Sequence, residues 1–131
     1  MHIESPKNTL GKSSKDVFEF LTEPKNFEVL MPDNVDKFEV VNPDTFLFAL
    51  KGMPEIALRK KEEIPNSKVV LGAASEKLPF TLTAHISETG QAQSEVYLSF
   101  EGEFNAMMAM MIKTPITNFI GTLSENMSKI G

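Results

Sequence analysis

Two glutamates separated by one residue have the spacing best suited to acid–base chemistry. Glu101 and Glu103 share one face of an alternating segment, so their Cα atoms would lie about 6.6 Å apart in a strand. Two carboxyl groups can act as general acid and base when both face a cavity. Their neighbours Phe100, Gly102 and Phe104 place the apolar face on the other side. We therefore expect both glutamates to point into solvent, and we assign no catalytic residue.

The two histidines, His2 and His85, lie far apart in the sequence, and their neighbours do not complete a set of metal ligands. His85 falls on the polar face of its predicted strand, which is typical of a surface histidine. The chain contains no cysteine, which removes disulfides, thiolate metal sites and cysteine nucleophiles. The sequence does not exclude a Ser-His-Asp triad, but no Gly-x-Ser-x-Gly motif marks a nucleophile. We predict no metal site and no cofactor.

Phosphate and nucleic acid are both poor matches to this chain. Residues 10–13, LGKS, resemble the end of a Walker A loop, but Pro6 stands where that motif needs its first glycine. The net charge of −5 argues against nucleic acid as a partner, because phosphate binding needs a basic face. The basic run at residues 59–61 is followed at once by two glutamates, which predicts a mixed, exposed strand face.

The composition is that of one folded domain covering residues 1–131. A hydrophobic share of 41% with 24% charged residues is typical of globular chains. Residues 1–10 lack the apolar region of a secretion signal, and no stretch approaches the roughly 18 apolar residues of a membrane span. We expect no stable membrane insertion and a cytoplasmic protein.

Two short helices are predicted to follow a first strand within residues 1–10. Ser13 and Asp16 resemble a capping box ahead of an apolar helical face that ends at Leu21. Pro24 occupies the favoured first position of the second helix, and Pro32 ends it. Both helices therefore precede the main run of strands.

The middle of the chain is predicted to form six strands joined by short turns, and only residues 75–78 make a longer link. Such connections join antiparallel neighbours. One face of the resulting sheet is apolar, and residues 105–130 can cover it as an amphipathic helix roughly 39 Å long. The predicted strands are 35–41, 45–51, 55–64, 67–74, 79–88 and 94–104. The apolar stripe of the helix consists of Ile116, Phe119, Ile120, Leu123, Met127 and Ile130.

This order of elements resembles the helix-grip fold of the START-like superfamily, also called SRPBCC or birch-pollen-allergen-like. The stretch SSKDVFEFLTEPKNFEVLMPDNVDKFEV is similar to the opening of many such chains, where a helix carrying V-F-x-x-L leads through an acidic-Pro step to a second helix and a proline. The resemblance implies an α+β fold, with a curved antiparallel sheet of about seven strands (β-α-α-β6-α) wrapped on the long C-terminal helix. It also implies a cavity between sheet and helix that family members use for lipids, sterols, quinones, polyketides or plant hormones.

We therefore predict that the chain binds a small hydrophobic ligand of the lipid, quinone or polyketide type. The first alternative is a cyclase- or hydrolase-type enzyme on the same fold, which predicts a charged or histidine side chain with a shifted pKa inside the cavity. The second is a protein-interaction module, either chaperone-linked or dimeric, which predicts a small or closed cavity and an exposed run at residues 107–111. The predicted cavity wall consists of Phe27, Leu30, Met31, Phe48, Phe80, Leu82, Leu98, Phe100, Met108 and Ile112.

Residues 104–112, FNAMMAMMI, hold four of the eight methionines. On a continuous helix, Met108 and Ile112 join the apolar stripe, whereas Met107, Met110 and Met111 face away from it. We call these last three the methionine surface. The sequence allows three explanations of what covers the methionine surface. The chain's own loops at 52–54 or 78–80 could pack on it, the methionines could form the mobile lid of a ligand cavity, or the surface could be a homodimer or membrane-surface contact.

Two residues predict irregular backbone near this run. Pro115 cannot donate a hydrogen bond to the carbonyl of Met111, which predicts a kink or a restart of the helix near residue 114. Gly102, inside the last strand, indicates either relief of a bend or space for a ligand.

Overall fold

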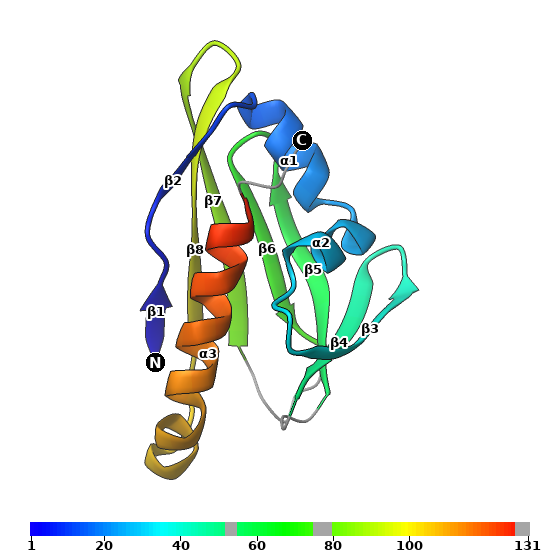
Figure 1. Cartoon of the computed structure of the whole chain (residues 1–131), viewed down its shortest axis with the longest axis vertical. Coiled ribbons are helices and arrows are strands. Elements are labelled where there is room, and N and C mark those ends of the chain that lie inside the picture. Colours follow the sequence, from blue (N-terminus) through cyan, green and yellow to red (C-terminus); the bar gives the residue numbers. More distant parts are fainter. Residues whose placement is uncertain (52–54, 75–79, 128–131) are drawn as a thin grey trace.

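The computed structural model describes residues 1–51, 55–74 and 80–127 of the chain (Figure 1). Within these residues the fold is α+β, with an eight-stranded antiparallel sheet and a long helix lying across one of its faces. The face under the helix is called the inner face below, and the other the outer face. The predicted link at 75–78 and the predicted end of the helix after residue 127 lie outside the described residues.

The sheet confirms all six predicted middle strands to within two residues at each end. Neighbouring strands follow the order β1-β8-β7-β6-β5-β4-β3, with β2 also pairing with β8. The predicted first strand is divided in two around Pro6, which has no N–H for the ladder. The strands are β1 (His2–Glu4), β2 (Asn8–Leu10), β3 (Val35–Asn42), β4 (Thr45–Leu50), β5 (Ile56–Ile64), β6 (Lys68–Ala73), β7 (Phe80–Gly90) and β8 (Gln93–Gly102).

The helices begin where the sequence predicts. The Ser13 hydroxyl accepts a hydrogen bond from the backbone N–H of Asp16 at 3.2 Å, which satisfies one free donor of the first turn. The second predicted helix is a 3-10 turn that begins with Pro24 and runs into a single α-helical turn. The helical elements are α1 (Ser14–Leu21), η1 (Pro24–Asn26), α2 (Phe27–Leu30) and α3 (Ala106–Asn126).

The core lies between the inner face of the sheet and α3. A row of stacked aromatic rings crosses it, from Phe27 in α2 through Phe46 and Phe48 in β4 to Phe119 in α3. Successive ring centroids are 5.0, 6.2 and 5.0 Å apart. Each such pair contributes about 0.5–1.5 kcal/mol beyond the apolar area it buries. The row therefore fixes the position of the middle of α3 against β4.

Helix α3 is attached firmly through its C-terminal half. The side-chain amide of Asn8 donates to the Ser124 carbonyl at 2.6 Å, and that of Asn126 donates to the Leu30 carbonyl at 2.9 Å. By contrast, no residue from 106 to 115 is buried. The first half of the helix thus packs only peripherally.

Of the kink and the restart expected near residue 114, the restart is wrong. Helix α3 is continuous, with Pro115 inside it. It begins at a good N-cap, because the Asn105 side-chain oxygen accepts a hydrogen bond from the N–H of Met108 at 2.8 Å. That cap lets the helix begin nine residues before the proline, so Pro115 costs a hydrogen bond to Met111 without ending the helix.

Gly102 makes room for a side chain of the protein itself. A Cβ atom added there would lie 2.6 Å from the Phe104 ring and 3.0 Å from Cβ of Phe80. The Phe104 ring also stacks on Phe100, with centroids 6.3 Å apart. The space that could have been kept for a ligand is therefore filled by Phe104.

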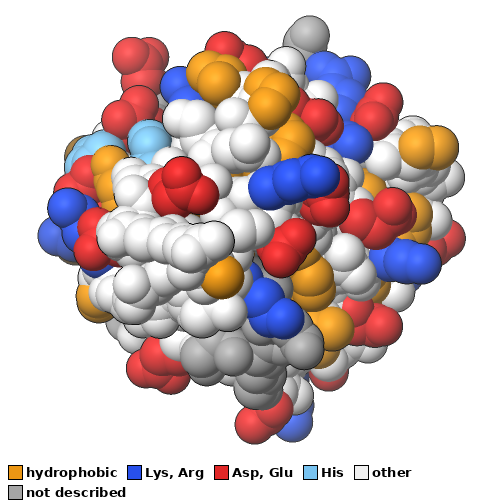
Figure 2. Space-filling model, turned by 90° about the horizontal axis from the view of Figure 1, so that it is seen from above, with side chains coloured by type: hydrophobic (Ala, Val, Ile, Leu, Met, Phe, Trp, Pro, Cys, Tyr) orange, Lys and Arg blue, Asp and Glu red, His pale blue; other side chains and the backbone are white. Residues whose placement is uncertain are grey.

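The surface mixes charges of both signs. Figure 2 shows acidic and basic side chains interspersed over one end of the molecule, with hydrophobic side chains only in small groups. None of the helices in the described part of the chain has the length and apolar character needed to cross a bilayer.

Candidate functional site

The interior between the sheet and α3 holds two small apolar voids. Each has a volume of about 10 Å³, roughly the space of one water molecule. Leu82 borders both voids, so they are neighbours on the inner face of β7. Every side chain around them is apolar. Between the described residues that line them, these two voids hold no room for an organic molecule without movement of their walls.

Six of the ten predicted wall residues surround these voids. Phe48, Phe80, Leu82 and Phe100 line one of them, and Phe27, Leu82 and Leu98 line the other. Of the remaining four, Leu30 and Met31 are buried in the core, while Met108 and Ile112 are half-buried on α3. The structure brings these four to the interior side of the molecule but to neither void.

A groove of about 410 Å³ lies beside the core, between α3 on one side and the segments around Pro32 and Leu50 on the other. Its size falls within the range of about 300–1,000 Å³ that is usual for ligand pockets. The floor is apolar and the rim is polar. The groove is lined by Pro32, Asn34, Leu50, Lys51, Thr114, Pro115, Asn118, Phe119 and Thr122.

Phe119 borders both this groove and one of the interior voids. Helix periodicity explains this double role. Pro115, Asn118, Phe119 and Thr122 follow i, i+3, i+4, i+7 spacing and form the stripe that faces the groove. The core-facing stripe of α3 also includes Phe119, which is 5% exposed. The sequence predicts that Phe119 lies on the apolar stripe. It does not predict that Phe119 also borders a groove, because this depends on the segments around Pro32 and Leu50 that lie opposite α3.

The methionine surface is exposed in this structure. Met107, Met110 and Met111 are 73%, 82% and 71% exposed, whereas Met108 and Ile112 are half-buried, as the helical phase predicts. The loops at 52–54 and 78–79, which were one expected cover, lie outside the described residues. Small voids together with an exposed methionine surface are what the interaction-module alternative predicts.

A lysine stands at the rim of the core. The Lys60 ammonium donates to the Thr22 carbonyl at 2.9 Å, and it pairs with Glu63 at 3.0 Å and Asp44 at 3.5 Å. Burial acts to lower the pKa of Lys60, but the two carboxylates outweigh it and the pKa is raised. Lys60 thus ties β5 to the end of α1 as a permanent cation.

His85 lies on the outer face, as its strand phase predicts. Its Nε2 atom lies 2.8 Å from the Ser99 hydroxyl, and its ring stacks on Tyr97 with centroids 4.4 Å apart. Burial lowers the pKa of His85, and the nearby Lys68 lowers it further, against the opposing effect of Glu4 and Glu101. A serine beside a histidine is one element of a nucleophilic site, but Ser99 is only 7% exposed and closed to a substrate.

Glu101 and Glu103 point outward, as the alternation predicts. Both are exposed, and Glu101 pairs with His2 at 3.0 Å. Neither glutamate therefore faces the described interior.

The architecture places the chain in a known structural class. The order strand, two short helices, antiparallel meander and long covering helix is the helix-grip arrangement, with eight strands here because the first is divided. Solved structures share it over nearly the whole chain. A truncated norcoclaurine synthase from Thalictrum flavum has a TM-score of 0.78 at 14% identity, covering 98% of this chain and 91% of the synthase.

Two bacterial proteins are similar in the same way. CV1439 from Chromobacterium violaceum has a TM-score of 0.70 at 12% identity, covering 98% of this chain and 96% of its own. XoxI from Bacillus cereus has a TM-score of 0.67 at 12% identity, covering 98% and 93%. No family model matches the chain, and no curated protein matches its sequence. At these identities the likeness shows the fold, which is the one expected of the START-like superfamily.

Proposed function

We propose that this protein binds a small molecule with an apolar body and a polar end, such as a lipid-, quinone- or polyketide-like compound. The groove between α3 and the segments at Pro32 and Leu50 is the binding site. The observation that carries this proposal is the position of Phe119, whose ring borders both the 410 Å³ groove and the interior void. A rotation of this one side chain joins the two spaces.

The groove matches such a ligand in polarity. Leu50, Phe119 and the two prolines offer an apolar floor, while Asn118 and Lys51 supply hydrogen-bond donors at the rim. Burial of apolar ligand surface contributes about 25 cal/mol per Å² before ordering costs, and the few polar groups orient the molecule.

The attachment of α3 supports opening at this point. Its C-terminal half is held by Asn8 and Asn126, whereas residues 106–115 contain no buried side chain. Pro115 removes one backbone hydrogen bond just before Phe119, which weakens the helix there. Movement of the first half of α3 therefore disturbs little of the core. The norcoclaurine synthase of the same fold, solved in complex with dopamine and hydroxybenzaldehyde, provides a precedent for small-molecule binding.

A fluorescence titration with the apolar probe N-phenyl-1-naphthylamine tests the site. Thr122→Trp fills the groove from α3 and is expected to weaken probe binding at least about tenfold, a loss of about 1.4 kcal/mol. Thr117→Trp is the matched control, since Thr117 is exposed on the same helix and lies outside the groove. Equal affinities of the two variants would show that the groove is not the site.

A second function is favoured by the exposed methionine surface, namely self-association through Met107, Met110 and Met111. Three large apolar side chains at i, i+3, i+4 spacing form one stripe that a second copy can cover. Sedimentation equilibrium distinguishes the two functions. If this surface is an interface, the wild type is a dimer and a variant with serine at all three positions is a monomer. A monomeric wild type would remove this second function and leave the groove proposal intact.

A further inference from the structure

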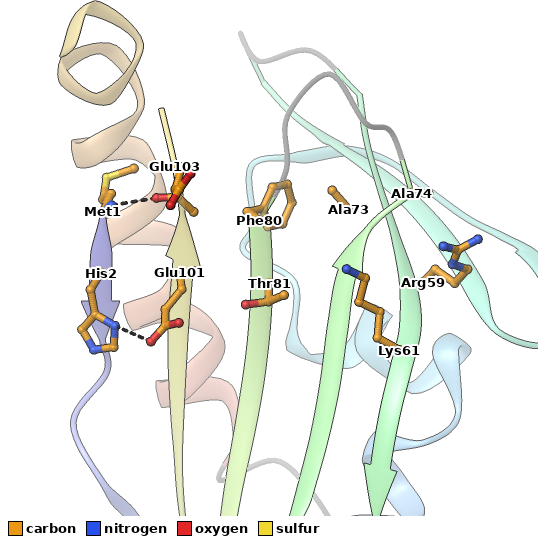
Figure 3. A pocket seen from close by; sticks show the side chains of 11 residues that line it. Met1, His2, Arg59, Lys61, Ala73, Ala74, Phe80, Thr81, Glu101 and Glu103 are labelled. Carbon is orange, nitrogen blue, oxygen red and sulfur yellow. Dashed lines mark hydrogen bonds and ion pairs between the residues drawn. The ribbon is translucent and has the colours of Figure 1, made fainter. Parts of the chain in front are cut away.

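The outer face of the sheet carries a hollow of about 850 Å³, on the side opposite α3. Figure 3 shows it with α3 behind the strands, and its lining residues lie on β1, β8, β7, β6 and β5 or directly next to these strands. It shares Phe80 with one of the interior voids but opens on the other face of the sheet. Its volume is within the usual range of ligand sites.

One cross-strand row of residues forms the base of this hollow. Arg59 pairs with Gly72, Gly72 with Thr81, and Thr81 with Glu101. Residues opposite one another in neighbouring strands share a face, so these side chains all belong to the outer surface. With strands about 4.8 Å apart, Arg59 and Glu101 lie at opposite ends of a row roughly 14 Å long.

A bulge adds a second cation to the same end as Arg59. The register of β5 against β6 shifts between Lys60 and Glu62, which leaves Lys61 as the extra residue. The Lys61 stem lies flat over Gly72, where an added Cβ atom would be 2.4 Å from its Cδ. Figure 3 shows the Lys61 ammonium extending from β5 toward Thr81. Glycine at position 72 is what allows this position of Lys61.

The charges that border the hollow are largely uncompensated. In the part of the chain that the structure describes, Arg59, Lys61 and Glu103 have no ion-pair partner. Among the described residues, Glu101 forms an ion pair with His2 alone, and His2 is charged only when protonated. The Met1 ammonium also lies at the glutamate end, where it donates to the Gly102 carbonyl at 2.7 Å, so Glu101 and Glu103 together outweigh one cation. A cationic end and an end with a net negative charge therefore face each other across Thr81.

From this arrangement we infer that the outer hollow binds an extended zwitterion of about tripeptide length, with its carboxylate at Lys61 and Arg59 and its ammonium at Glu101 and Glu103. A purely anionic ligand would be repelled by the glutamates, and a purely cationic one by Arg59 and Lys61, so only a ligand with both charges matches both ends. From Gly72 to Glu101 the row crosses two strand spacings, about 10 Å, which equals three extended residues at about 3.3 Å each.

An NMR titration with trialanine tests the inference on the 15N-labelled protein. The amide signals of Gly72, Thr81 and Glu101 should shift with peptide concentration. Trialanine that is acetylated at one end and amidated at the other has lost both charges. It should bind about fivefold to tenfold more weakly than free trialanine, because each exposed ion pair contributes only a few-fold in affinity. Equal binding of free and capped peptide, or an absence of shifts in this row, would overturn the proposal.

Crossing protein variants with capped peptides assigns each end. Lys61→Ala should weaken free and N-acetylated trialanine about threefold but leave C-amidated trialanine unchanged, because that peptide has already lost the carboxylate that Lys61 binds. Glu103→Gln should show the reverse pattern. Lys68→Ala is the matched control, since Lys68 lies on the outer face of the neighbouring strand β6, opposite His85 and two same-face rows away from Gly72. The proposal is contradicted if Lys68→Ala weakens peptide binding as much as Lys61→Ala does. It is also contradicted if Lys61→Ala and Glu103→Gln weaken all the peptides equally, whichever end is capped.

Discussion

Replacing Phe119 with alanine tests whether this ring separates a groove from the core. A buried phenylalanine changed to alanine usually costs about 3–5 kcal/mol. Phe119 is 5% exposed and stacks on Phe48 at 5.0 Å. The space it leaves, however, joins the groove instead of becoming a sealed cavity. We therefore expect a loss in unfolding free energy near the lower limit, about 3 kcal/mol, or roughly 12 °C in Tm.

Phe46→Ala is the matched control for this variant. Phe46 is 1% exposed, its ring contacts those of Phe27, Phe38 and Phe48, and it borders neither void nor groove. Its removal should cost about 5 kcal/mol. Urea denaturation measures both losses, and titration with N-phenyl-1-naphthylamine should show tighter binding for Phe119→Ala alone. If Phe119→Ala costs as much as Phe46→Ala and leaves probe affinity unchanged, the ring is ordinary core and the reasoning fails. Should Phe119→Ala be too unstable to measure, Phe119→Leu gives the same comparison with a smaller loss.

Three further outcomes follow from the geometry. Gly102→Ala should lower the unfolding free energy by about 1–3 kcal/mol, because the new Cβ meets the Phe104 ring; Phe104→Ala in the same chain should remove most of the added loss in a double-mutant cycle. Because the pKa of His85 is lowered in the fold, the unfolded chain takes up this proton first as pH falls. The wild type should therefore lose stability relative to His85→Gln below about pH 6.5 and show the same pH dependence above that value. Urea denaturation of both proteins below and above pH 6.5 measures this, and an equal difference in unfolding free energy on both sides would contradict it. Asn105→Ala removes the N-cap of α3, so hydrogen exchange at residues 106–112 should accelerate roughly fivefold, as expected for a cap contributing about 1 kcal/mol, and unchanged exchange would show that the cap contributes nothing.

Much of the fold follows from local signals in the sequence. The six middle strands follow from alternating apolar residues separated by turns, and the start of α1 follows from Ser13 and Asp16. Helical phase alone separates Met108 from the exposed Met107, because a continuous helix fixes which side chains share a face. These features depend on residues within about ten positions of one another.

The interior could be predicted less completely, because it depends on distant pairings. Six of the ten predicted wall residues reach the voids, but the volume left between them depends on how α3 settles against β4 through Phe48 and Phe119. The filling of the space at Gly102 by Phe104 likewise depends on a side-chain rotation. The restart expected at Pro115 fails because a cap at Asn105 begins the helix earlier.

The outer hollow, too, could be predicted only in its local features and not in its pairings between strands. The sequence shows a basic run at residues 59–61 followed by glutamates and predicts an exposed strand face, which is where Arg59 and Lys61 lie. It does not show that a bulge turns Lys61 over Gly72, or that four strands bring Glu101 into the same row. Register between strands decides these neighbours.

The proposed function depends on where an apolar molecule contacts the protein. Intermolecular NOEs from bound N-phenyl-1-naphthylamine to methyl- and ring-labelled protein measure this directly. The groove proposal predicts contacts to the Leu50 methyl groups and the Phe119 ring, and to Leu82 if the ring moves aside. Contacts confined to the methyl groups of Met107, Met110 and Met111 would place the ligand on the outside of α3 and contradict it.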